Sequence, residues 1–92
     1  MERDKRYRIT KNLILSGHLK EFREIFDSVP KTRVAKDMGT NYVRLNKLID
    51  YLPGFTLKDF ISISELLDVD LKVVLDLVAS QYAGDKKSKR KK

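Results

Sequence analysis

The sequence has no cysteine, one histidine and no long apolar run. The lack of cysteine excludes a disulfide framework, a thiolate zinc site and a thiol nucleophile. The single histidine, His18, cannot form a metal site alone. No apolar stretch approaches the roughly 20 residues that a membrane-spanning helix needs, and the charged start MERDKRYRIT has no apolar signal core. We therefore expect a cytoplasmic protein with no membrane segment.

Motifs of catalysis are also missing. The chain has no Ser–His–Asp set, no Gly-rich phosphate loop and no cluster of metal ligands in sequence. Two aspartates, Asp68 and Asp70, fit a helix cap and a turn better than a pair of catalytic carboxylates. We expect that the protein is not an enzyme and uses no cofactor.

What the sequence does contain is a moderate apolar fraction and an uneven positive charge. Its 92 residues, of which 41% are hydrophobic, suit one domain with a single modest core. The formal net charge is +7, with +3 on residues 31–50 and +5 on residues 83–92, whereas residues 51–82 carry −3. This distribution favours a polyanion partner that meets one side of the protein.

Apolar residues recur at three- and four-residue spacing along most of the chain, which is typical of amphipathic helices. The pattern predicts helices over residues 10–16, 19–28, 31–38, 42–51, 57–67 and 71–82. The first eight residues are polar, and we expect them to be frayed. The fold class is thus all-α: a compact bundle of five to six short helices over residues 1–82, followed by a disordered basic tail over residues 83–92.

Residues 31–50, KTRVAKDMGTNYVRLNKLID, have the spacing of a helix-turn-helix. Where two helices cross, a small side chain such as Ala35 lets their backbones approach. Four residues later, Gly39 supplies the positive φ that a tight turn needs. Asn41 is then favoured as the N-cap of the second helix rather than as a base contact. The predicted motif core comprises Val34, Ala35, Met38, Gly39, Leu45 and Leu48.

Residues 31–78 resemble the lambda-repressor-like, Cro-type family of helix-turn-helix regulators. The resemblance includes the stretch after the motif, where a helix ends in Leu66–Leu67 and an aspartate cap precedes the last helix. Three residues depart from the family pattern: Thr40 replaces an aliphatic residue, Lys31 a common glutamine, and Ile49 a polar residue. The substitution at Ile49 predicts deeper packing of the second motif helix.

The resemblance implies a sequence-specific DNA-binding transcriptional regulator, with the helix over about 42–51 in the major groove of double-stranded DNA. It also implies a homodimer formed through the last helices. The residues expected to contact bases are Tyr42, Val43, Asn46 and Lys47, with a phosphate contact equally open for Tyr42. The residues expected to contact the DNA backbone are Lys31, Thr32, Arg33, Asn41 and Arg44.

Two other classes of function remain open at this stage. One is a small basic RNA-binding protein whose main contact is the tail. The other is an antitoxin-like interaction module that holds a protein partner with its acidic C-terminal helices. Without the motif, the basic residues of 31–50 would most simply form a solvated helix face.

Overall fold

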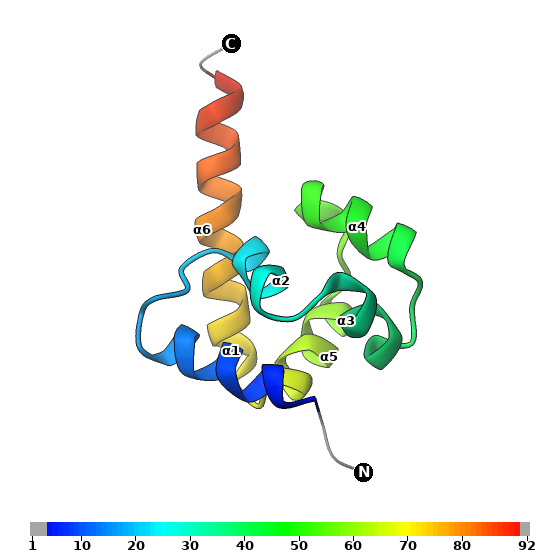
Figure 1. The fold of residues 1–92 in the computed structure, drawn as a ribbon. Helices are drawn as coiled ribbons and strands as arrows, with labels where there is room; N and C mark the ends of the chain where they lie inside the picture. Colours follow the sequence, from blue (N-terminus) through cyan, green and yellow to red (C-terminus); the bar gives the residue numbers. More distant parts are fainter. Residues whose placement is uncertain (1–3, 91–92) are drawn as a thin grey trace.

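The structure is a computed structural model that describes residues 4–90, with the backbone alone described for residues 85–90. Over this part of the chain every regular element is helical, which confirms the all-α prediction (Figure 1). The elements are α1 (Lys5–Leu15), the 3₁₀ turn η1 (Phe22–Glu24), α2 (Ile25–Ser28), α3 (Lys31–Met38), α4 (Tyr42–Asp50), the 3₁₀ turn η2 (Leu52–Gly54), α5 (Leu57–Leu67) and α6 (Leu71–Arg90).

The core is built around α5, which packs against α1, α3 and α6. Phe22 lies at its centre and is fully buried. The ring of Phe22 meets those of Phe26, Phe55 and Phe60 edge to face, with centroids 5.5, 5.4 and 5.9 Å apart. Such edge contacts are a favoured aromatic geometry. The phenylalanines are therefore core residues.

The predicted start of the first helix is wrong, because α1 begins at Lys5 rather than at residue 10. Asp4 is its N-cap and accepts a hydrogen bond from the Arg6 amide. Tyr7 is only 3% exposed, so the first turn is packed rather than frayed. The helix ends at Leu15, before Gly17 at φ 83°, close to the predicted stop.

The second predicted helix also begins later than expected. The chain stays extended at Glu21 and turns through η1 into α2, instead of being helical from residue 19. The cause is the Glu24 carboxylate, which accepts the amides of Lys20 at 2.9 Å and Glu21 at 2.7 Å. This cap fixes where the turn starts.

The last helix is longer than the sequence suggests. α6 continues through residues 83–90, which were expected to belong to a disordered tail, while residues 91–92 lie outside the described chain. Lysine and arginine are good helix formers, and extending a helix that is already packed avoids the cost of nucleation. Among the described residues, no helix is long and apolar enough to cross a membrane.

Candidate nucleic-acid interface

The helix-turn-helix is formed by α3 and α4, with bounds within one residue of those predicted. Gly39 ends α3 at φ 79°, and the Thr40 amide donates to the Ala35 carbonyl at 2.9 Å. A Cβ added at Gly39 would meet nothing within 4 Å. The backbone conformation, and not lack of space, therefore calls for glycine here.

Five of the six residues of the predicted motif core lie in or against the core of the fold, whereas Gly39 is exposed at the turn. Val34, Ala35 and Leu45 are buried, and Met38 and Leu48 pack against the core from its edge. Ile49 is buried too, as its departure from the family pattern predicted. One face of α4 is thereby fixed to the protein, and the opposite face points to solvent.

The start of α4 is set by Asn41. Its Oδ1 accepts the Arg44 amide at 2.8 Å, which confirms the predicted cap. The rest of the Asn41 side chain is exposed, so its amide nitrogen can still reach a neighbouring group such as a phosphate oxygen.

The four predicted base contacts share the outer face of α4. Tyr42 and Val43 are 45% and 60% exposed, Lys47 is exposed, and Asn46 is half-buried. Their positions, i, i+1, i+4 and i+5, place them on adjacent turns of one helix face. Because the chain leaves Tyr42 and Val43 uncovered, this face offers apolar and polar surface together.

Asn46 has a partner that the sequence did not reveal. Lys31 Nζ, at the start of α3, donates to Asn46 Oδ1 at 2.7 Å. This bond joins a predicted backbone contact to a predicted base contact across 15 positions of sequence. It orients the Asn46 amide, so that the oxygen faces Lys31 and the NH₂ group faces away.

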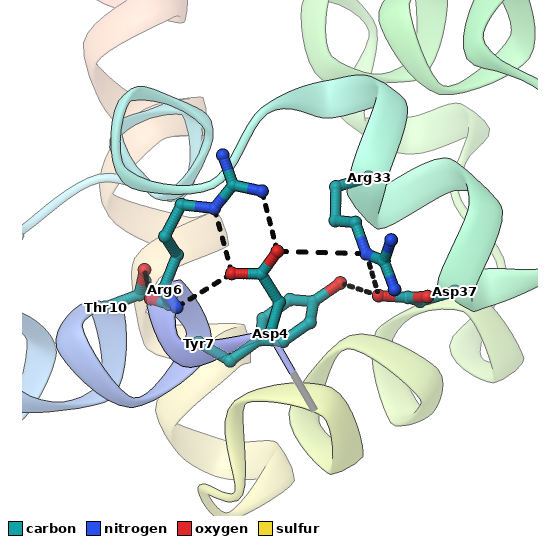
Figure 2. A network of polar contacts seen from close by, with 6 residues as sticks. All are labelled: Asp4, Arg6, Tyr7, Thr10, Arg33 and Asp37. Carbon is teal, nitrogen blue, oxygen red and sulfur yellow. Dashed lines mark hydrogen bonds and ion pairs between the residues drawn. The ribbon is translucent and has the colours of Figure 1, made fainter. Parts of the chain in front are cut away.

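Arg33 belongs to a network that docks α1 on α3 (Figure 2). Its Nε lies 3.2 Å from Asp37 Oδ2 and 3.9 Å from Asp4 Oδ2. Tyr7 donates its hydroxyl to Asp37 Oδ2 at 2.6 Å. Burial and this bond raise the pKa of Tyr7, while the Arg6 guanidinium holds the pKa of Asp4 far below its usual range.

Arg44, a second predicted backbone contact, also has internal partners. Its guanidinium binds both oxygens of Asp59, at 2.8 and 3.3 Å. The Nη1 atom, which binds Asp59 Oδ1, also donates to the Thr40 hydroxyl at 3.3 Å. This contact gives a physical reason for a hydroxyl at position 40, where the family that residues 31–78 resemble has an aliphatic residue.

Asp59 connects this pair to the start of α5. It completes a capping box with Thr56, as predicted, by accepting the Thr56 amide at 2.9 Å. Burial alone would raise the pKa of Asp59, but the bonds from Arg44 and Thr56 outweigh it and leave the pKa lowered. Arg44 and Asp59 thus hold the first turn of α4 against α5.

Gln81 of α6 supports the candidate interface from inside the fold and was not predicted from the sequence. It is fully buried, accepts the Arg23 amide at 2.6 Å and donates to the Ile49 carbonyl at 2.9 Å. It therefore ties the C-terminal end of α4 to α6. A signal was present, because Gln81 follows the buried Val74 and Leu77 by seven and four residues, on the same face of the helix.

Comparisons with known proteins leave the family open: no family model matches the chain, and no curated protein or solved structure matches it significantly. The resemblance to lambda-repressor-like regulators therefore depends on the motif and on the arrangement of its helices.

Proposed function

We propose that the protein is a sequence-specific DNA-binding transcriptional regulator that places α4 in the major groove. The observation that carries the proposal is the geometry of α3 and α4. A glycine turn with positive φ joins them, and the face of α4 with Tyr42, Val43 and Lys47 is left uncovered. An exposed helix of this size fits the major groove.

The start of α3 suits a DNA phosphate. α3 begins after Pro30 with no side-chain cap, so its first amides remain available to an anion. Lys31 and Thr32 follow directly, and Lys31 is bound to Asn46. A phosphate held at this end would fix the register of α4 in the groove.

The exposed side chains of α4 match the groups that bases present in the major groove. Lys47 can donate to guanine acceptors, Val43 can pack on a thymine methyl, and Asn46 can pair with adenine. Lys31 occupies one lone pair of Asn46 Oδ1, which leaves the other to accept from adenine N6, while the outward NH₂ group donates to adenine N7. A good contact of this kind contributes about 1–3 kcal/mol of discrimination.

Dimerisation completes the proposal. Partly exposed apolar side chains, Ile61 of α5 and Leu75 and Tyr82 of α6, lie on the two helices that follow the motif. Pairing of this surface with a second copy would present two α4 helices to half-sites about 34–36 Å apart. The bound sequence is then expected to be a pseudopalindrome.

The test begins with selection of bound duplexes from a random pool by the full chain. We expect a palindromic consensus. Replacing the outer polar pair, Asn46→Ala with Lys47→Ala, should abolish discrimination and leave weak, salt-sensitive binding. A matched control is Asn12→Ala with Lys72→Ala, the same residue types at exposed positions of α1 and α6. Specific binding that survives the α4 change would show that α4 does not contact the bases.

A second candidate follows from the same apolar surface on α5 and α6, whose surroundings are acidic. An antitoxin-like protein would use it for a different protein partner instead of a second copy. A stoichiometric partner that copurifies with the wild type, and is lost on Leu75→Lys, would favour this function. It is compatible with binding of DNA through α4.

A further inference from the structure

α6 is the longest helix of the fold, and its second half leaves the bundle. The packing of α6 reaches as far as Gly84, where an added Cβ would lie 3.3 Å from the Glu21 carboxylate. The backbone remains helical from there to Arg90. Figure 1 shows this end of α6 rising clear of the other helices.

The place where α6 leaves the fold is set by Gln81. The bond from Gln81 Nε2 to the Ile49 carbonyl, 2.9 Å long, puts this turn of α6 beside the C-terminal end of α4. The nine residues from there to Arg90 extend the helix by about 13 Å, at roughly 1.5 Å per residue. The extension therefore starts at the proposed recognition helix and not at a remote surface.

The charge of the chain changes sign at the same point. Residues 51–82 carry a net −3, whereas residues 83–90 have four basic residues and one acidic residue, a net +3. Backbone phosphates attract such a segment and are repelled by the one before it.

We propose that residues 83–90 of α6 form a helical arm that binds the DNA phosphates flanking the base pairs contacted by α4. This inference depends on the proposed function. A flexible tail of the same composition would raise affinity along the whole duplex, whereas a helix anchored by Gln81 reaches one flank at a fixed distance from α4.

Two variants at Ser88 test whether binding of the flank needs the helical structure of the arm or only its charge. Ser88→Pro interrupts the helix, since proline lacks the amide for the Gly84 carbonyl and clashes with it. Ser88→Ala keeps the helix, and both variants retain every charge. On the selected duplex we expect Ser88→Pro to lose hydroxyl-radical protection of the flanking base pairs. The slope of log K against log salt concentration should be smaller by about 2–3, because each lost phosphate contact reduces it by about 0.9. Ser88→Ala should behave as the wild type. Equal binding by the two variants would overturn the helical arm.

The absence of cysteine allows a direct measurement of position. An iron chelate on Ser88→Cys has one attachment site, and on Ser16→Cys, at the exposed end of α1, it provides the control. We expect cleavage by the Ser88 probe in one cluster outside the base pairs protected by α4, and none by the Ser16 probe. Three results would overturn the arm if the unmodified protein still protected the base pairs at the α4 site: diffuse cleavage, no cleavage, or equal cleavage of single-stranded RNA. If the unmodified protein did not protect those base pairs, the proposed function would be wrong as well.

Discussion

Gln81 helps to fix the position of α4. It accepts the Arg23 amide in a partly buried bond and donates to the Ile49 carbonyl, in the last turn of α4, in a buried one. Carbonyls of a last helical turn have no partner within the helix. Loss of the side chain therefore leaves the Ile49 carbonyl buried without this hydrogen bond and removes the acceptor that the Arg23 amide uses.

We predict that Gln81→Leu, which preserves most of the volume, lowers the free energy of unfolding by about 2–4 kcal/mol. Gln81→Ala should cost more because it also opens a cavity. Denaturant titration followed by circular dichroism measures both. The neighbouring exposed Ser80→Ala is the control and should change stability by less than about 0.5 kcal/mol. A Gln81→Leu variant as stable as Ser80→Ala would contradict the role given to these bonds.

The bond between Lys31 and Asn46 makes a different prediction, about binding. Lys31→Met removes the donor but keeps an unbranched side chain. Because Asn46 then loses its orientation, we expect weaker binding to all duplexes and also weaker discrimination at the base that Asn46 contacts. Lys36→Met, an exposed position on the same helix, should lower binding uniformly.

A double-mutant cycle of Lys31→Met with Asn46→Ala measures the coupling in electrophoretic or fluorescence titrations. Residues in one hydrogen-bond network couple by about 0.5–3 kcal/mol. A coupling close to zero would mean that Lys31 acts on the DNA backbone alone.

At the scale of elements, carboxylates hold the starts of three helical segments. Asp4 caps α1, Glu24 caps η1, and Asp59 caps α5. The pKa of each is lowered: Asp4 mainly by the Arg6 side chain, and Glu24 mainly by the Lys20 and Glu21 amides. For Asp59, burial opposes the shift, and the bonds from Arg44 and Thr56 outweigh it.

These shifts predict the direction of acid unfolding. A carboxylate with a lowered pKa binds fewer protons in the folded protein than in the unfolded chain, so its contribution is complete above the unfolded pKa of about 4. It is lost as the pH falls through the lower, folded value. We expect the Tm to be level from about pH 7 to 5 and to fall steeply below pH 4.

Asp4→Asn tests the contribution of one cap. It retains an acceptor for the Arg6 amide but cannot form the ion pair, so its Tm should be lower at pH 7 and fall less between pH 5 and pH 2. If the Tm curve of the variant runs parallel to that of the wild type, Asp4 does not contribute to the pH dependence.

The bounds of the helices show which parts of the fold could be predicted from the sequence. The motif helices α3 and α4 were placed within one residue, because Gly39 and Asn41 are local signals. The start of α1 was missed, because Tyr7 is buried by a partner 30 positions away, Asp37. Within the candidate site, the exposure of Tyr42 follows from helical periodicity. The internal partners of the lysine and arginine side chains depend on how the helices pack, and no local pattern encodes that.

At the scale of the whole molecule, the sign of the net charge changes from element to element. Net positive charge lies in α1, the motif and the end of α6, while α5 and the first part of α6 are acidic and carry exposed apolar side chains. An acidic surface with exposed apolar side chains is poorly suited to bind DNA and well suited to bind another protein. The two properties together favour a dimer that meets DNA on its basic side.

The dimer is predicted to depend on α6 and not on α1. Leu75 of α6 and Leu15 of α1 are 38% and 62% exposed, so lysine is tolerated by the monomer fold at either position. Because Leu75 lies on the proposed interface, Leu75→Lys should yield a monomer in sedimentation equilibrium and bind a single half-site weakly. Leu15→Lys, which replaces the more exposed leucine, should remain a dimer with unchanged affinity for the full site. Dissociation by Leu15→Lys alone would place the interface on α1, and a wild-type monomer at high concentration would exclude a dimer formed before DNA binding.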